Sequence, residues 1–213
     1  VSPLHAQFTA DLSRFSPYAP SSRLWLNVLH IDPDAAAAAM GFGTRRNRNH
    51  RADRTPLVDW PEASRQRLGV LQALYRRVRD AGRLQGSSPL ARDFRAFRRG
   101  GGVPLMAHAV FEALHAHFYG LSSGLWHWRA WPAGFRDPDD AAIRRLGRKH
   151  EESVGFHLFL QWLAARQFRA ASEAGTQAGM RSGIIKDRAV GADGGGSEAW
   201  SNPGRMLAGA AIG

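Results

Sequence analysis

The hydrophobic positions from residue 60 onward recur every three or four residues, which is the period of an α-helix. The first such stretch begins at Pro61, a residue favoured in the first turn of a helix, and ends at Gly82. Its apolar positions are Leu68, Leu71, Leu74, Tyr75 and Val78. A helix between Pro61 and Gly82 is therefore expected.

The same period continues to residue 178 and predicts three more helices. They cover about residues 89–98, residues 104–119, and a longest helix that begins near Asp139 or Lys149 and ends before Gly179. The apolar stripe of the longest helix contains Val154, Phe156, Leu158, Phe159, Trp162, Leu163 and Phe168. The chain is therefore predicted to be mainly α, with a few short strands.

Two short apolar runs have the length of buried strands. Leu24–Ile31 is closed by Asp32 and Pro33, and a short alanine-rich helix is expected after it. Residues 183–187 are expected to form a strand that ends at Asp187. A long helix followed by such a strand is half of an α/β unit, and the chain supplies few strands to pair with it. We therefore expect an internal piece of a longer protein, in keeping with an N-terminus that lacks Met.

The pattern divides the chain into three segments. Residues 1–56 are rich in loops and contain a short strand, residues 57–138 are helical, and residues 139–213 contain the long helix, the strand ending at Asp187 and a glycine-rich loop. The glycines at 194–196 lack the Lys-Ser/Thr ending of a phosphate-binding loop, so we interpret them as part of a mobile loop.

Composition is typical of a globular protein, with 44% hydrophobic and 22% charged residues. No apolar run approaches the roughly 18 residues of a membrane span, so no membrane association is predicted. The absence of cysteine excludes disulfides and thiolate metal sites and suits a reducing, cytoplasmic location.

The net charge of +11 suggests an alternative, a basic helical module that binds nucleic acid. The basic run consists of Arg45, Arg46, Arg48, Arg51 and Arg54. No aromatic residue for base stacking is interleaved with it, and Lys149 and Lys186 are the only lysines, which indicates a compositional bias towards arginine. A solvated loop is the preferred interpretation, and no nucleic-acid partner is predicted.

Histidines and tryptophans leave further alternatives. His108 and His115 lie seven residues apart, as do His150 and His157, so a four-histidine metal cluster is conceivable. Helical zinc sites use i, i+4 pairs with a nearby acid, which are missing here, so no metal is predicted. The tryptophans that follow the third helix could form a sugar-stacking platform or belong to the core; they are Trp126, Trp128 and Trp131.

Five segments, in order along nearly the whole chain, resemble one enzyme family. They are SPYAPSSRLWLNVLHIDP at residues 16–33, FEALHAHF at 111–118, WRAWP at 128–132, FHLFLQWLAARQ at 156–167 and DRAVGADGGGSEAW at 187–200. The family is that of the 4-α-glucanotransferases of the amylomaltase (disproportionating enzyme) type, glycoside hydrolase family 77.

The resemblance implies a partial, interrupted (β/α)8 barrel with a helical insertion, acting on α-1,4-glucans or maltooligosaccharides without a cofactor. In such barrels the chemistry lies at the C-terminal ends of strands. The resemblance assigns substrate binding to Tyr18, Ser22, Asn27, Asp187 and Trp200. Ser182 and Arg188 depart from the family pattern around Asp187.

The resemblance also implies that the catalytic carboxylates lie beyond residue 213. Retaining transfer uses two carboxyl groups about 5 Å apart. The candidates within the chain are interpreted as solvated or capping carboxylates; they are Glu112, Glu151, Glu152 and Glu198. The chain alone is therefore predicted to be inactive. A noncatalytic α-glucan-binding piece is the remaining alternative, and the oligomeric state is left open.

Overall fold

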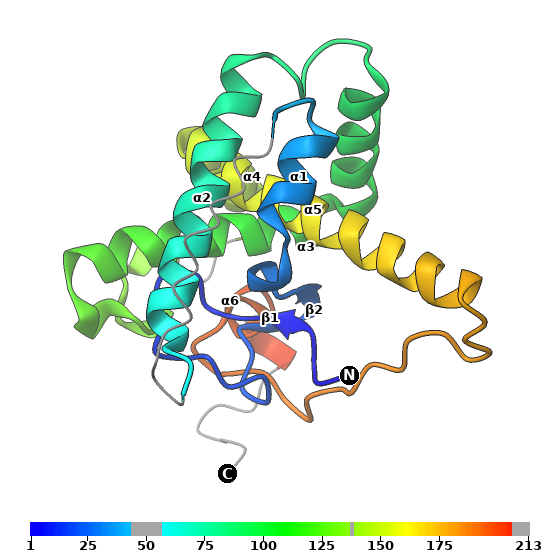
Figure 1. The fold of residues 1–213 in the computed structure, drawn as a ribbon. Coiled ribbons are helices and arrows are strands. Elements are labelled where there is room, and N and C mark those ends of the chain that lie inside the picture. The colour runs from blue at the N-terminus through cyan, green and yellow to red at the C-terminus, as the bar shows by residue number, and fades with distance from the viewer. Residues whose placement is uncertain (44–56, 137–138, 206–213) are drawn as a thin grey trace.

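The computed structural model describes residues 1–43, 57–136 and 139–205, and helices make up most of them (Figure 1). The helices are α1 Pro33–Ala39, α2 Trp60–Asp80, α3 Pro89–Leu121, α4 Asp140–Lys149, α5 Glu151–Gln177 and α6 Ser197–Ser201. Strands β1 His5–Ala6 and β2 Ser22–Leu26 pair antiparallel in a two-stranded sheet. The prediction of a mainly α chain with a few short strands is confirmed.

Side-chain caps explain where the long helices begin. Asp59 accepts a hydrogen bond from the Glu62 N–H at the start of α2, and Ser88 and Asp139 cap α3 and α4 in the same way. Such caps satisfy backbone N–H groups that have no partner inside the helix. The positive φ of Gly179, 90°, follows the end of α5 at the predicted stop.

Helix α3 contains the two helices predicted for residues 89–98 and 104–119. They are separated by Gly102, which has φ 54° and ψ −146°, two residues before Pro104. A backbone with this φ suits glycine, and the proline removes a helical N–H, so the break follows from the local sequence. The predicted longest helix is also divided, into α4 and α5, with His150 between them.

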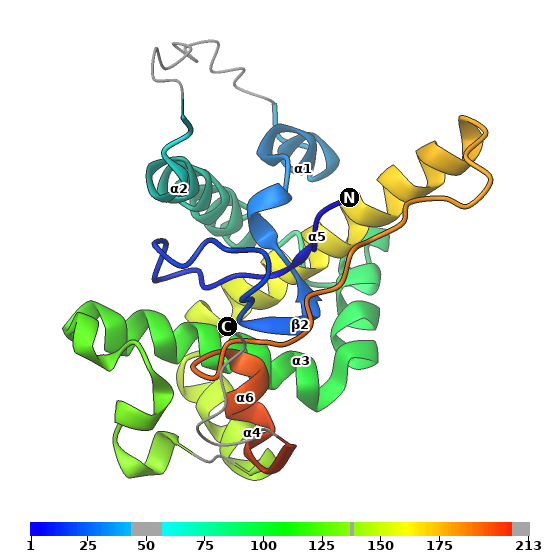
Figure 2. The same ribbon diagram turned by 90° about the horizontal axis from the view of Figure 1, so that it is seen from below.

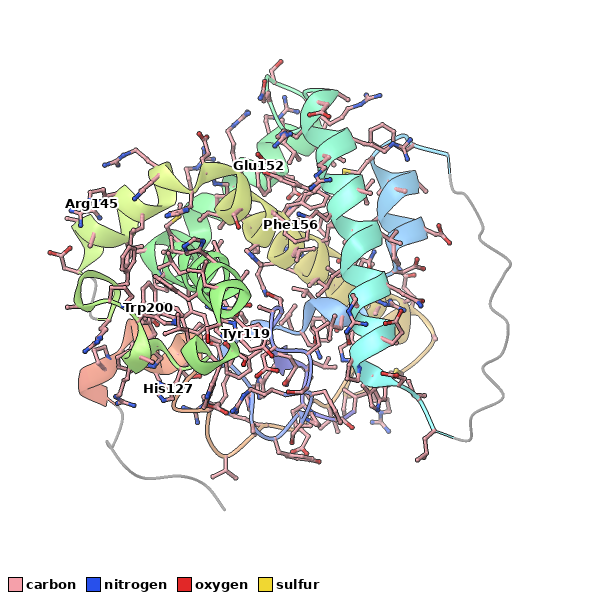
Figure 3. The ribbon with its side chains drawn as sticks, turned by 90° about the vertical axis from the view of Figure 1, so that its left-hand side faces the viewer. Tyr119, His127, Arg145, Glu152, Phe156 and Trp200 are labelled. Atoms are coloured by element: carbon pink, nitrogen blue, oxygen red, sulfur yellow. The ribbon has the colours of Figure 1, made fainter. Side chains whose placement is uncertain are left out.

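The core lies between α3 and α5 and draws on all three segments of the chain. Its largest fully buried side chains are Trp131, Trp162, Trp200, Phe8, Phe111 and Phe159. Helix α4 buries Ile143 and Leu146 and turns its basic side chains outward, as Arg145 at the edge of the molecule shows (Figure 3). Burial of these apolar side chains is the main source of stability.

Two glutamines of α5 hold the end of β2 and the start of α1 in place. The Gln161 side chain accepts a hydrogen bond from the Leu26 N–H at 3.1 Å and donates one to the Leu26 carbonyl at 2.9 Å. Gln167 does the same with Asp32, at 2.8 and 2.9 Å. Each amide therefore satisfies a backbone donor and a backbone acceptor that the short sheet leaves free.

The strand predicted for Leu24–Ile31 is shorter than expected. Strand β2 ends at Leu26, and residues Val28–His30 form a 3-10 turn. The Asn27 side chain accepts a hydrogen bond from the Leu29 N–H at 3.0 Å, which caps this turn and ends the extended run.

The strand predicted for residues 183–187 is wrong. The segment runs back from α5 past the N-terminus without a strand assignment (Figures 1 and 2). The Asp187 N–H of this segment donates a hydrogen bond to the Val1 carbonyl at 3.0 Å. Ile185 is 74% exposed, which does not suit a buried strand. The sheet of the described residues consists of β1 and β2, and this segment belongs to neither strand.

Two further expectations concern the arginine run and a membrane span. The arginine run of residues 45–54 lies outside the described residues. Among the helices in the described part of the chain, none is long and apolar enough to cross a membrane.

Candidate functional site

Tyr18 and Asp187 lie together on the surface although 169 residues separate them. The Tyr18 hydroxyl donates to Asp187 Oδ2 at 3.4 Å, and both side chains are exposed. Tyr18 stands in a turn between Pro17 and Pro20, whose rings restrict the backbone. The structure thus brings together two of the five residues assigned to substrate binding.

The other three assigned residues differ in exposure. Ser22 is 1% exposed and its hydroxyl accepts from the Leu24 N–H at 3.2 Å. Asn27 is half-buried and lines a cavity of about 270 Å³ together with Leu4 and Phe168. Asn27 therefore remains accessible, whereas Ser22 does not.

Trp200 lies in the core of the described structure. Its side chain is fully buried, packs against Phe111 and Trp131, and donates from Nε1 to the Phe135 carbonyl at 2.7 Å. Figure 3 labels it on α6. In this conformation neither Trp200 nor Ser22 can contact a glucan, because neither side chain reaches the surface. Trp200 instead packs in the core, and the Ser22 hydroxyl binds a backbone N–H of its own strand.

Arg23 and Glu198 join strand β2 to helix α6. Arg23 donates to Glu198 Oε1 from Nη2 at 2.6 Å and from Nε at 3.1 Å, and its backbone N–H donates to Oε2 at 2.7 Å. Burial would raise the pKa of Glu198, but the hydrogen bonds from Arg23 outweigh it and lower the pKa. Of the two predicted roles, solvated or capping, the solvated one is wrong for Glu198, which lies in the first turn of α6.

The glycine-rich stretch is packed, contrary to the expectation of a mobile loop. Gly195 and Gly196 are buried, and a Cβ on Gly196 would lie 2.6 Å from the Ser21 Cα. The Asp193 N–H donates to the Pro20 carbonyl at 2.8 Å, and α6 begins directly after the glycines. The glycines therefore allow the close approach of two backbones, which a side chain would prevent.

The tryptophan group mainly supports the core. Trp131 is 0% and Trp128 5% exposed. Trp126 is half-buried, and the Arg14 guanidinium lies 3.5 Å from its ring centroid while pairing with Asp193 at 3.0 Å. A cation–π contact occupies that face of Trp126, so the group does not form an open stacking platform.

Glu112 is a buried carboxylate rather than a solvated one. It is 1% exposed and accepts hydrogen bonds from the Thr9 hydroxyl at 2.6 Å, the Thr9 N–H at 3.2 Å and the Ser21 hydroxyl at 3.3 Å. Burial raises the pKa of Glu112 to about 7, against the opposing effect of these hydrogen bonds. Glu112 is closed off from solvent and has no direct access to a bound glucan.

The buried histidines are neutral near pH 7. Burial lowers the pKa of His108 and of His157 to about 3, and that of His115 to about 4. His108 Nδ1 lies 2.8 Å from the Ser197 hydroxyl. Within the described residues, no group of three or more potential ligands is arranged for a metal ion, so the conceivable four-histidine cluster is not formed there.

Sequence reasoning missed Glu112, Arg23 and Gln161. A signal existed for two of them: Glu112 and Gln161 occupy positions within apolar helical stretches, FEAL and LFLQWL, where a solvated side chain is not expected. Nothing local in the sequence marks Arg23, because its partner lies 175 residues away.

Comparison with known proteins defines the class. Residues 1–213 match the model of glycoside hydrolase family 77, described as 4-alpha-glucanotransferase. The chain belongs to this family. The 4-alpha-glucanotransferase of Mycobacterium tuberculosis H37Rv is 32% identical over 193 residues, which cover 87% of this chain and 25% of that protein. The Haemophilus influenzae 4-alpha-glucanotransferase is 27% identical over 228 residues, covering 100% of this chain and 32% of that protein.

Solved structures agree on the fold. The amylomaltase from Streptococcus agalactiae in complex with acarbose aligns with a TM-score of 0.75 at 20% identity, over 95% of this chain and 38% of that one. The amylomaltase from Corynebacterium glutamicum aligns with a TM-score of 0.59 at 25% identity, over 92% of this chain and 25% of that one. The chain spans about a quarter to a third of the length of the curated relatives it matches.

Proposed function

We propose that this chain is part of a 4-α-glucanotransferase that transfers α-1,4-glucan segments between maltooligosaccharides. Family membership supports the reaction class. The observation that carries the proposal for this chain is the contact of Tyr18 with Asp187, because two exposed residues from separate family-like segments meet on one surface.

The proposed binding mode follows from the chemistry of sugars. A pyranose ring presents an apolar face that packs against an aromatic ring, and hydroxyls that need fixed polar partners. Tyr18 supplies the ring, and the Asp187 carboxylate accepts hydrogen bonds from hydroxyls. Asn27 is proposed to contribute from its own cavity. We further propose that the chain forms part of an interrupted (β/α)8 barrel, with residues 57–138 as the helical insertion.

The proposed mechanism is a retaining double displacement. It requires a nucleophile that forms a covalent glucosyl-enzyme and a second carboxyl group that protonates the leaving oxygen, about 5 Å apart. Glu112 is sealed from solvent and Glu198 is bound to Arg23, so neither suits these roles. We therefore propose that residues 1–213 bind glucan and do not contain the catalytic pair, and that no cofactor takes part. The cytoplasmic location stays a prediction.

Calorimetry of maltoheptaose binding to the purified chain tests the proposal. We expect Tyr18→Ala and Asp187→Asn each to weaken binding about tenfold, which corresponds to about 1.4 kcal/mol. Asp34→Asn is the matched control, an exposed aspartate on α1 that should leave binding unchanged. Absence of binding by the unsubstituted chain, or equal affinity in all three variants, would contradict the proposal.

An activity assay separates binding from catalysis. The chain is incubated with maltotriose, and glucose and longer maltodextrins are sought by chromatography. We expect none above the level of the Asp187→Asn variant, because a single carboxylate cannot serve as both nucleophile and acid. Disproportionation above that level would place the catalytic carboxylates within residues 1–213.

A further inference from the structure

One buried carboxylate holds both ends of the loop that carries Tyr18. Glu112 Oε2 accepts from the Thr9 N–H at 3.2 Å and from the Thr9 hydroxyl at 2.6 Å, while Oε1 lies 3.3 Å from the Ser21 hydroxyl. Thr9 and Ser21 flank residues 10–20, which contain neither helix nor strand. The position of Tyr18 therefore depends on how these two ends are fixed.

The hydrogen bonds continue from Ser21 into the neighbouring loop. The Ser197 N–H donates to the Ser21 hydroxyl at 3.0 Å, and the Ser197 hydroxyl lies 2.8 Å from His108 Nδ1. The Asp193 N–H also donates to the Pro20 carbonyl at 2.8 Å. The segment that leads from Asp187 to α6 is thus tied to the same buried network as the Tyr18 loop.

Packing alone does not explain a carboxylate at this position. Removing a carboxylate from water is costly, and an apolar side chain of similar volume commonly stabilises a core more. A carboxyl group differs from every apolar side chain in accepting several hydrogen bonds at once. At residue 112 this capacity is used for three donors, all from the two ends of a single loop.

We propose that Glu112 is a positioning residue that fixes residues 9–21 against α3 and thereby holds Tyr18 beside Asp187. This inference rests on the proposed function, in which Tyr18 and Asp187 contact glucan. Glu112 does not touch the substrate; it acts through the loop. A purely structural carboxylate would stabilise the whole fold, whereas a positioning residue acts on the Tyr18 loop and on glucan affinity.

Hydrogen exchange measured by mass spectrometry distinguishes the two roles. In Glu112→Gln we expect peptides covering residues 9–21 to exchange at least tenfold faster, an increase larger than any change in peptides from the buried part of α5, residues 157–164. Glutamine keeps the shape of the side chain but replaces one acceptor oxygen with a donor. Glu173→Gln is the matched control on the exposed side of α5 and should exchange as the unsubstituted chain does.

Substitutions at Thr9 test the same link without altering Glu112. Thr9→Val has nearly the same shape but lacks the hydroxyl, so it should loosen residues 9–21 and weaken maltoheptaose binding several-fold. Thr9→Ser keeps the hydroxyl and should restore both properties. If Glu112→Gln fails to fold, the two Thr9 variants still test whether the contact with Glu112 holds residues 9–21 in place.

The proposal is overturned if residues 9–21 exchange at the original rate in the folded Glu112→Gln and Thr9→Val variants, or if exchange rises equally in α5. Hydrogen exchange requires no glucan, so its result for Glu112 is independent of the proposed function. If the unsubstituted chain does not bind maltoheptaose while the loop still loosens as expected, the proposed function fails and the anchoring of the loop by Glu112 stands.

Discussion

The guanidinium of Arg23 donates two hydrogen bonds to Oε1 of Glu198, from Nη2 at 2.6 Å and from Nε at 3.1 Å. The two residues are 175 positions apart in the sequence. The two side chains are 23% and 12% exposed, so solvent screens this pair less than a surface pair. Arg23 also donates to the Val190 carbonyl at 2.8 Å. The pair therefore fastens the segment between Asp187 and α6 onto β2.

Breaking this pair should destabilise the chain. Glu198→Gln removes the charge and leaves a half-buried guanidinium without its partner, which we expect to cost about 1–3 kcal/mol of unfolding free energy. Glu62→Gln is the control, because its partner Arg65 is 65% exposed; we expect a change below about 0.5 kcal/mol. Urea denaturation measures both. Equal effects would mean that the Arg23–Glu198 pair behaves as an ordinary surface pair.

Gly196 should tolerate no side chain. A Cβ at this position would lie 2.6 Å from the Ser21 Cα, and backbone atoms cannot rotate away as a side chain can. We expect Gly196→Ala to lower the unfolding free energy by about 1–3 kcal/mol. Gly194→Ala, whose Cβ would meet nothing within 4 Å, should change it little. Thermal unfolding compares the two variants, and similar melting temperatures would argue against the tight contact between the two loops.

Local pattern predicts the helices because periodicity and caps are properties of neighbouring residues. Helix α2 follows from its apolar spacing and from Pro61 and Gly82 at its ends. The break at Gly102 is likewise visible as a gap between two helical patterns. The early end of β2 is not predictable in this way, because it depends on the side chain of Asn27 capping the next turn.

The candidate site is harder to predict because its contacts are remote in sequence. The apolar FEAL stretch argues against a solvated Glu112, but no neighbouring residue reveals its partners, because Thr9 and Ser21 meet it across 103 and 91 residues. The glycine-rich composition of residues 194–196 suggests a mobile loop. In the structure, however, Gly196 lies so close to Ser21 that a Cβ would clash with the Ser21 backbone. Resemblance assigns Trp200 to the substrate, whereas in three dimensions its side chain is part of the core.

The raised pKa of Glu112 predicts a specific pH dependence. Its folded pKa of about 7 exceeds the ordinary value of 4.5, so the folded state binds this proton more tightly than the unfolded state does. The resulting stability is fully present below pH 4.5 and is lost as pH rises to about 7. In the original chain the free energy of unfolding should therefore fall by about 2–3 kcal/mol between pH 5 and pH 8 because of Glu112. The Glu112→Gln variant should lack this decrease.

Urea unfolding of the original chain and of Glu112→Gln at pH 5 and pH 8 provides the comparison. The difference between the two proteins isolates Glu112, because His108, His115 and His157 titrate in both. The lowered pKa values of those histidines act in the opposite direction, since their neutral folded forms lose stability as pH falls below 6.5. A difference between the two proteins that is independent of pH would show that Glu112 titrates in its ordinary range.

The central claim is that Tyr18 and Asp187 form a glucan-binding surface, and NMR titration of the ¹⁵N-labelled chain with maltoheptaose tests it most directly. We expect the largest shifts in backbone amides of residues 16–23 and 185–190, with α4 unaffected as an internal reference. The same titration of the Tyr18→Ala variant should need about ten times more sugar to produce equal shifts. Saturable shifts confined to other parts of the chain, or no shifts at millimolar maltoheptaose, would contradict the claim.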